Sequence, residues 1–277
     1  MFLLELLKTL LLGIVEGVTE WLPISSTGHM ILLNEFISLD VTPEFWEMFE
    51  VVIQLGAILA VVVLFFGKLN PFSPKKTAME KKGTWRLWCL VILAVLPSAV
   101  IGLLLDDWLN DHLYRYEVVA ITLVLYGIAF ILIEKFRKDH PIRVDRVENL
   151  SWRDALCVGG FQVLSIIPGT SRSGSTILGG MMLGLSRTAA AEFSFYLAIP
   201  TMAGASLLKA VKFFLDGNRL GGEEITILLV GLLTAFLVSL LVIRYLMDYV
   251  RRHSFSAFGV YRIVLGALVL GYFLLVA

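Results

Sequence analysis

The sequence predicts an all-α integral membrane protein with six transmembrane helices and two re-entrant helical hairpins. Three observations lead to this fold class. First, 58% of the 277 residues are hydrophobic, only 17% are charged and the mean hydropathy is +0.84, so the chain cannot form an ordinary water-soluble surface. Second, six apolar segments have about the 17 to 25 residues that a spanning helix needs. Third, two further apolar segments are interrupted at their centres by proline, glycine and hydroxyl residues.

In chain order, the six predicted spans lie at residues 45–66, 87–105, 117–133, 189–215, 225–246 and 258–276. The interrupted segments cover residues 2–36 and 155–185, and their centres read LPISSTGH and IPGTSRSG. Backbone that leaves the helix at membrane depth is tolerated only inside protein or beside a wet cavity. We therefore expect each interrupted segment to enter the bilayer, turn and return to its own side.

With two returning hairpins, the basic connections fall on one face of the membrane. These connections are residues 67–86, residues 135–153 and the turn at Arg251 and Arg252. The positive-inside rule makes this face cytoplasmic, whereas the opposite loops are rich in Asp and Glu. Both termini then lie outside, so the first hairpin enters from outside and the second from the cytoplasm. The formal net charge is zero, which gives no basic excess for binding nucleic acid.

The two interrupted segments also predict an inverted-topology repeat within a single membrane domain, residues 1–277. Repeat 1 covers about residues 1–136 and repeat 2 about residues 150–277. Each centre is followed by a long helix that opens with an acid, Glu50 or Glu192. Opposite orientation would bring the two centres together near the midplane. Three residues of each centre match at a constant offset of 145: Pro23, Ser25 and Ser26 with Pro168, Thr170 and Ser171.

Acidic, hydroxyl and imidazole side chains gather in the first interrupted segment. Glu16 and Glu20 are four residues apart and share one helix face, and they are followed by Ser25, Ser26, Thr27 and His29. Ionisable groups inside a membrane are costly and usually serve function. The alternative is that the glutamates pair with Lys8 or line a helix contact, and that Ser25 or Ser26 only caps the returning helix.

The second interrupted segment has the composition of an anion site at the start of a helix. Glycines let the backbone approach a ligand, helix-terminal N–H groups favour an anion, and arginine grips phosphate oxygens through two donors. The alternative is a capping turn with a snorkelling arginine, but Arg172 lies at the centre of its segment. The predicted phosphate-binding residues are Ser25, Thr27, Gly169, Thr170, Ser171, Ser173 and Gly174. Together with the acids and His29, they suit phosphoryl transfer better than acyl transfer.

Metal ligation is predicted only at the glutamates. Glu16 and Glu20 offer the oxygen ligands that Mg²⁺ or Ca²⁺ takes, whereas no His or Cys set has zinc spacing. No organic cofactor is expected. Cys89 and Cys157 lie in apolar segments, and we expect them to be packing residues. The remaining histidines fall in loops or at helix ends, where we expect them to be solvated: His112, His140 and His253.

The motifs EGVTEWLPISSTGH (residues 16–29) and PGTSRSG (residues 168–174) resemble those of the undecaprenyl-diphosphate phosphatase family, also called the bacitracin resistance protein family. The stretches FEVVIQLGAILAVV and AEFSFYLAIP share this resemblance, which runs through nearly the whole chain. It implies a multipass plasma-membrane enzyme that converts undecaprenyl diphosphate to the monophosphate carrier of peptidoglycan precursors and thereby confers bacitracin resistance. It also implies a functional set, namely Glu16, Glu20, Ser26, His29 and Arg172.

The sequence leaves several alternatives open. Either Ser26 or His29 could be the nucleophile, and either Glu20 or His29 could take the serine proton. A polyprenyl-phosphate flippase or an anion transporter could use the same midplane groups, because inverted repeats with broken helices are also a transporter architecture. The expected partners are the polyprenyl diphosphate and membrane lipids. A homodimer could use the small-residue pairs Gly13–Gly17 and Gly180–Gly184, and neither the preferred prenyl length nor the metal follows from the sequence.

Overall fold

The chain forms a bundle of α-helices in a computed structural model that describes residues 2–113, 115–137 and 141–275, with backbone alone for residues 106–111. Six helical stretches are long and apolar enough to cross a membrane, which confirms the six predicted spans. They are Pro43–Leu64, Ala78–Leu105, Tyr116–Phe136, Arg187–Leu215, Gly222–Arg252 and Ser256–Leu275. Val276, at the end of the last predicted span, lies outside the described residues.

The helices differ from the predicted spans mainly at their ends. The first span is divided into α3 (Pro43–Val52) and α4 (Gln54–Leu64), and a short α5 (Phe66–Leu69) follows. The second belongs to α6 (Ala78–Leu113), which contains Pro97 and begins nine residues before the apolar run. The others are α7 (Tyr116–Phe136), α10 (Arg187–Leu215), α11 (Gly222–Arg252) and α12 (Ser256–Leu275).

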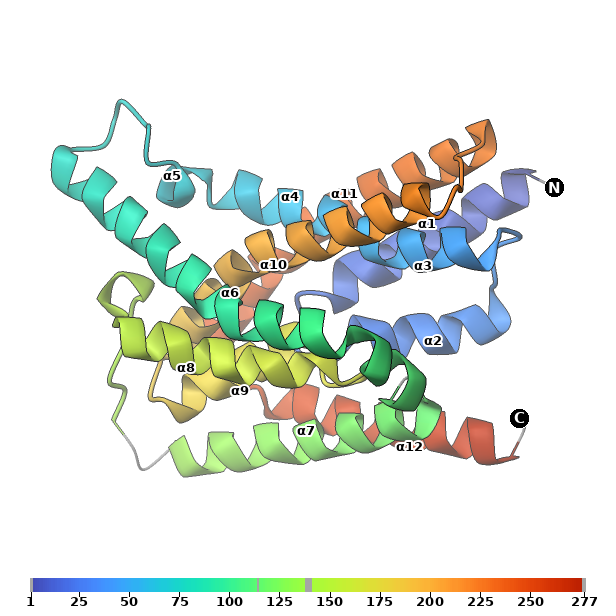
Figure 1. The fold of residues 1–277 in the computed structure, drawn as a ribbon. Coiled ribbons are helices and arrows are strands. Elements are labelled where there is room, and N and C mark those ends of the chain that lie inside the picture. Colours follow the sequence, from blue (N-terminus) through green and yellow to red (C-terminus); the bar gives the residue numbers. More distant parts are fainter. Residues whose placement is uncertain (1, 114, 138–140, 276–277) are drawn as a thin grey trace.

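Four shorter helices make up the two interrupted segments. The first segment forms α1 (Phe2–Thr19) and α2 (Ser26–Phe36), separated by residues 20–25, which we call the first break. The second forms α8 (Trp152–Val163) and α9 (Arg172–Met182), separated by residues 164–171, the second break, which includes the 3-10 helix η3 (Leu164–Ile166). In Figure 1, α1 and α2 extend from the middle of the bundle toward the end that carries both termini, whereas α8 and α9 extend toward the opposite end.

The two breaks end in the same local geometry. Ser25 and Ser171 are the only described non-glycine residues with positive φ, 73° and 72°. Each is the N-cap of the following helix, and each side chain accepts a hydrogen bond from the N–H three residues on, Gly28 or Gly174. The caps are therefore 146 residues apart rather than 145. The sequence register, which matched Ser26 with Ser171, is wrong at the caps because the second break holds one more residue between its proline and its cap.

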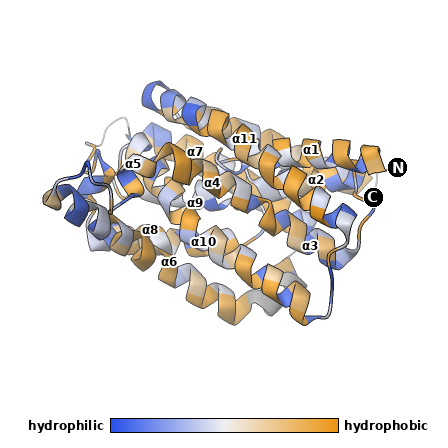
Figure 2. Ribbon diagram, turned by 90° about the horizontal axis from the view of Figure 1, so that it is seen from above, coloured by the Kyte–Doolittle hydropathy of each residue, from blue (hydrophilic) through white to orange (hydrophobic). Residues whose placement is uncertain are grey.

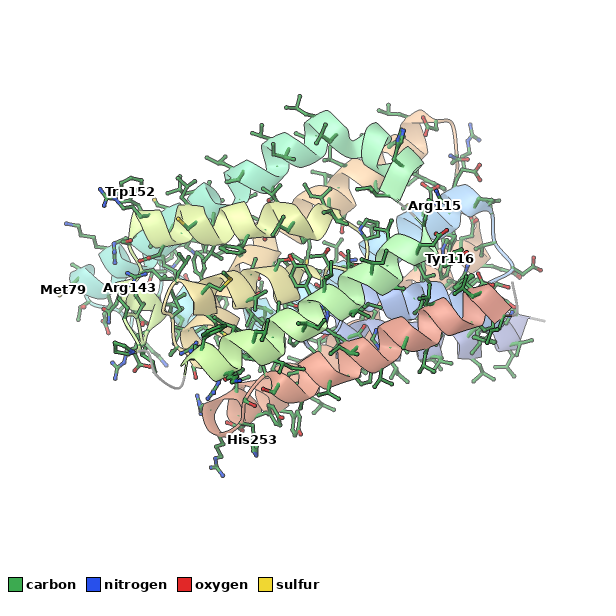
Figure 3. All side chains as sticks on the ribbon, turned by 90° about the horizontal axis from the view of Figure 1, so that it is seen from below. Met79, Arg115, Tyr116, Arg143, Trp152 and His253 are labelled. Atoms are coloured by element: carbon green, nitrogen blue, oxygen red, sulfur yellow. The ribbon has the colours of Figure 1, made fainter. Side chains whose placement is uncertain are left out.

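Polar residues concentrate at the ends of the bundle, and apolar residues cover the helices between them (Figure 2). Met79, Arg143 and Trp152 lie at one end, and Arg115 and Tyr116 lie at the other (Figure 3). We call these the basic end and the termini end. Near the basic end, the 3-10 helix η2 (Val147–Asn149) precedes α8, and the half-buried Arg187 pairs with the buried Glu134 at 2.5 Å. Cys89 and Cys157 are exposed, so the prediction that they are packing residues is wrong.

Glycines allow several helix pairs to pack with their backbones in contact. A Cβ on Gly56 of α4 would lie 2.1 Å from the Leu232 carbonyl oxygen of α11, and one on Gly159 of α8 would lie 2.2 Å from that of Ala94. Gly13 and Gly17 of α1 pack against α11 in the same way. These two glycines therefore serve a contact within the chain, and the homodimer stays a prediction.

The close approach of α8 to α6 gives a stability prediction with an adjacent control. Gly159→Ala should destabilise the protein by ~1–3 kcal/mol, because the added methyl group overlaps the Ala94 backbone. Gly160→Ala, whose Cβ would meet nothing within 4 Å, should be neutral or stabilising by about 1 kcal/mol, since alanine is the better helix former. Thermal unfolding in detergent compares them. Equal melting temperatures for the two variants would contradict the backbone contact between these helices.

Candidate active site

The first break places its polar side chains by a helical turn followed by a capped helix. The Glu20 N–H still donates to the Glu16 carbonyl at 3.0 Å, so the two carboxylates lie one turn apart, as the sequence predicts. Ser25 takes the capping role at the start of α2, and this frees Ser26, the first residue of that helix. The open question of which serine is the cap is therefore answered in favour of Ser25.

Glu20 is the centre of the site because its two carboxylate oxygens have different partners. The Ser26 hydroxyl donates to Oε2 at 2.8 Å, and the Arg172 guanidinium donates to Oε1 at 2.8 Å. Glu20 and Arg172 are nearly buried, with side-chain exposures of 7% and 11%, and water screens such a pair poorly. A hydroxyl, a carboxylate and a guanidinium from the two hairpins thus form one hydrogen-bonded chain.

Several groups from other elements orient the Arg172 side chain. Its Nη1 donates to the carbonyl and hydroxyl oxygens of Ser194 in α10, at 2.8 and 3.2 Å. The guanidinium lies over the buried Trp21 ring, 5.5 Å from the centroid. Its Nε is buried and has no hydrogen-bond partner among the described residues. One donor of the fork therefore has no partner among the described residues.

The other predicted residues of the second break have mainly structural partners. The buried Ser173 hydroxyl lies within hydrogen-bonding distance of the Glu20 and Leu22 carbonyls, at 3.0 and 3.3 Å. Gly169 has φ 82° and packs so closely on α7 that a Cβ would lie 2.3 Å from the Thr122 hydroxyl. These residues join the breaks to each other and to α7, and direct phosphate binding by them stays a prediction.

The remaining predicted phosphate-binding residues surround the start of α9 and of α2. Ser171 caps α9, where Gly174 provides the capped N–H. The Thr170 hydroxyl is buried and has no partner among the described residues. Thr27 lies in the first turn of α2 and is half-buried. The start of α9 keeps the unpaired N–H groups of a helix N-terminus, which is the feature that favours an anion there.

Glu16 is the second carboxylate of the site and is 1% exposed. Its Oε1 has no hydrogen-bond partner in the described part of the chain, which is costly for a buried carboxylate. The described residues contain no group of three or more His, Cys, Asp or Glu that could hold a metal ion. Mg²⁺ commonly takes only one or two carboxylates together with phosphate and water, and metal binding by Glu16 and Glu20 stays a prediction.

Both ring nitrogens of His29 have hydrogen-bond partners other than Ser26. Its Nδ1 lies 2.7 Å from the Ser25 carbonyl oxygen, and its Nε2 lies 2.7 Å from the Tyr261 hydroxyl of α12. A carbonyl can only accept, so Nδ1 carries the proton in the neutral ring and Nε2 accepts from Tyr261. Both residues line a lateral, mostly apolar cavity of about 480 Å³ between α1, the first break and α12.

A fully buried arginine, Arg262, holds the two breaks together. Its Nη1 donates to the Pro23 carbonyl at 3.1 Å, and its Nη2 donates to the Gly169 and Thr170 carbonyls at 2.9 and 3.0 Å. The guanidinium also lies over the Tyr126 ring, 5.3 Å from the centroid. Two breaks whose flanking helices extend toward opposite ends of the bundle (Figure 1) therefore share one cation.

Sequence reasoning missed Arg262, Tyr261 and Ser194. The signal for Arg262 was present, because a cation within an apolar span is expensive and marks an internal partner. Tyr261 and Ser194 gave no such signal, since isolated hydroxyls are common in apolar helices. Of the other histidines, His112 and His253 are exposed, which agrees with the prediction, and His140 lies outside the described residues.

The two interrupted segments thus enclose a charged, hydroxyl-rich site within a bundle of apolar helices, six of them long enough to span a membrane. These features define a polytopic integral membrane protein with a buried polar site. The sequence profile of the bacitracin resistance protein BacA matches residues 9–268. The chain belongs to the bacitracin resistance protein BacA family. The resemblance of its two motifs predicted this family, and the prediction is confirmed.

Relatives in this family are similar along their whole length. The chain is 59% identical to an undecaprenyl-diphosphatase of Streptococcus thermophilus over 271 residues, which covers 98% of this chain and 94% of the relative. It is 56% identical to an undecaprenyl-diphosphatase of Enterococcus faecalis over 274 residues, 99% of both chains. A Lactiplantibacillus plantarum undecaprenyl-diphosphatase is 55% identical over 274 residues, 99% of this chain and all of the relative.

The contacts of Arg262 predict a large effect on stability. Arg262→Gln should lower the free energy of unfolding by about 3 kcal/mol or more, because several buried carbonyls lose their donor. Arg244→Gln, which removes an exposed arginine from α11, should change it by less than about 0.5 kcal/mol. Thermal unfolding in detergent measures both. A melting temperature for Arg262→Gln equal to that of Arg244→Gln would show that Arg262 does not hold the breaks.

Proposed function

We propose that this chain is an undecaprenyl-diphosphate phosphatase that removes the terminal phosphate from the lipid diphosphate and regenerates the monophosphate carrier for peptidoglycan synthesis. Its relatives carry the name undecaprenyl-diphosphatase and cover almost the whole chain. The observation that carries the proposal is the hydrogen-bonded chain of Ser26, Glu20 and Arg172. By consuming the diphosphate lipid that bacitracin binds, this activity would raise bacitracin resistance.

In the proposed mechanism, the Ser26 oxygen attacks the terminal phosphorus and Glu20 takes the serine proton. Glu20 is favoured over His29 as the base because it already accepts the Ser26 hydrogen bond at 2.8 Å. The bond between the terminal phosphorus and the bridging oxygen breaks, and the lipid monophosphate leaves. Glu20 gives its proton to the leaving monophosphate. Water then attacks the phosphoserine, and Glu20 takes a proton from this water and passes it to the Ser26 oxygen as the bond between that oxygen and phosphorus breaks, which releases inorganic phosphate.

Arg172 and His29 have separate roles in this mechanism. Arg172 neutralises charge on the equatorial oxygens, and its unpaired Nε is a donor for one of them. His29 Nε2, which faces Tyr261, is placed to hold or pass a proton on the side of the lateral cavity. A histidine nucleophile would first have to give up the Tyr261 hydrogen bond, and this favours Ser26.

Glu16 and Glu20 would hold a divalent cation shared with the substrate. When bound, such a cation would neutralise phosphate charge. The buried, unpartnered Oε1 of Glu16 supports this assignment. No observation favours the flippase or transporter alternative, because transport does not need a hydroxyl bonded to a carboxylate at the centre of the site.

We further propose that α1–α2 and α8–α9 are re-entrant hairpins related by an inverted repeat. The supporting features are their opposite directions in Figure 1 and the matching serine caps at positive φ. With both hairpins returning, the basic end is cytoplasmic by the positive-inside rule. The active site then opens to the external side, where glycan transfer leaves the diphosphate lipid.

The function is tested by phosphate release from undecaprenyl diphosphate by purified protein in detergent. Ser26→Ala should abolish turnover, and Arg172→Lys should lower it at least about a hundredfold, because lysine cannot contact Glu20, Ser194 and phosphate in a planar fork. Ser206→Ala and Arg187→Lys change a buried serine and a paired arginine away from the site and should retain turnover.

Three outcomes separate the alternatives. Phosphate release within tenfold of the wild type in Ser26→Ala would reject serine as nucleophile, and an acid-labile phosphoenzyme would assign that role to histidine. No phosphate release by the folded wild-type protein would reject the enzyme and leave the transporter. Activity unchanged after chelation and dialysis would remove the metal from the proposal.

The sidedness is tested with single cysteines in a chain that lacks Cys89 and Cys157. Glu44→Cys at the termini end should react with a membrane-impermeant thiol reagent in intact cells. Asn149→Cys at the basic end should react only after the membrane is opened. Both native residues are exposed, so access to the side chain is matched. The reverse pattern would make the site cytoplasmic.

A further inference from the structure

A second cavity, whose lining contains none of the candidate active-site residues, lies at the basic end. Its volume is about 350 Å³, and it is formed by α5, the beginning of α6 and η2. Three cations line it, Lys68, Lys76 and Arg86, together with two acids, Glu80 and Glu148. We call it the basic cavity.

The positive charge of the basic cavity is poorly neutralised. Lys76 donates to the Lys68 and Asn70 carbonyls and to the Thr84 hydroxyl, and Arg86 donates to the Glu148 and Leu150 carbonyls. Neither cation forms an ion pair with a carboxylate in the described part of the chain. Carbonyl dipoles orient these two side chains but leave their full charges in place.

The two acids offset these charges only in part. Glu80 accepts from the N–H and hydroxyl of Thr77 at 2.7 and 2.8 Å, as a cap at the start of α6. Glu148 lies 3.8 Å from Lys68, whose closer partner is the buried Glu192 at 2.5 Å. Three cations in the lining therefore face two carboxylates. The surrounding segment, residues 67–86, adds three more lysines.

Exposed aromatic side chains place the basic cavity at the level of lipid headgroups. Phe72 and Trp85 are 76% and 50% exposed, and their rings meet edge to face with centroids 5.6 Å apart. Trp152 lies at the same end of the bundle (Figure 3), and the Arg153 guanidinium lies over its ring. Exposed tryptophans beside basic residues are typical of a membrane–water interface, so a ligand here can keep its acyl chains in the bilayer.

We propose that the basic cavity binds the phosphate headgroup of an anionic phospholipid. A lipid fits better than free phosphate because the cations adjoin exposed aromatic rings, and basic segments next to a membrane attract anionic lipids. The contacts of Lys68 connect this site with the catalytic centre. Its partner Glu192 lies in α10, two residues before Ser194, which holds Arg172.

The test measures lipid binding to the purified full-length protein by native mass spectrometry from detergent micelles. Short-chain phosphatidylglycerol should bind at least about tenfold more tightly than phosphatidylcholine of the same chain length. The double variant Lys76→Gln/Arg86→Gln should lose about thirtyfold in affinity for phosphatidylglycerol, which corresponds to ~1 kcal/mol per basic residue. The double variant Lys75→Gln/Lys82→Gln removes the same charge from the same segment outside the cavity and should lose less than about threefold.

Other outcomes would overturn the proposal. Equal losses in the two double variants would show attraction by net charge alone, and equal affinity for both lipids would show no headgroup recognition. Full displacement of the lipid by millimolar inorganic phosphate would assign the site to free phosphate. A measurement on the wild type does not depend on whether the variants fold. In it, a photoactivatable phosphatidylglycerol should label peptides within residues 67–90 or 147–150. Labelling confined to other segments would also reject the site.

Discussion

The structure depends on satisfying the backbone of two helix breaks that lie deep within the bundle. Carbonyl groups that leave a helix cannot find water in a hydrocarbon environment, and each unpaired group is costly. Arg262 supplies donors to Pro23 in the first break and to Gly169 and Thr170 in the second. Because these carbonyls belong to segments about 145 residues apart in the chain, one buried cation both stabilises the breaks and fixes their separation.

The arrangement of the candidate active site follows from this fixed separation. Ser173 contacts the first-break carbonyls, and Thr122 of α7 donates to the Pro168 carbonyl at 2.8 Å, so the second break is held on two sides. Arg172 can then reach Glu20, and Glu20 can reach Ser26. The start of α9 also keeps the unpaired N–H groups of a helix N-terminus, a feature that favours an anion.

The two ends of the bundle provide different chemistry. The termini end carries the start of α1 and the end of α2 (Figure 1), and the segments there are largely acidic. The basic end concentrates lysines, arginines and exposed aromatic rings. Helix α10 extends between them, with Glu192 paired to Lys68 and Ser194 holding Arg172. An enzyme that acts on a lipid diphosphate gains from both, since it must retain a hydrophobic tail in the bilayer while it processes a charged headgroup.

The sequence by itself determined the membrane class, the six spans, the two interrupted segments and the polar set that meets in the site, because hydrophobicity and the cost of buried charge are local properties of the chain. Glu16 and Glu20 could be placed on one face by their spacing alone. Only the tertiary structure decided that Ser25 is the cap, that Glu20 rather than His29 bonds Ser26, and that the caps are 146 residues apart. The roles of Arg262 and Tyr261 also required it, since each is defined by a partner more than 230 residues away in sequence, and no local pattern records which distant groups a fold brings into contact.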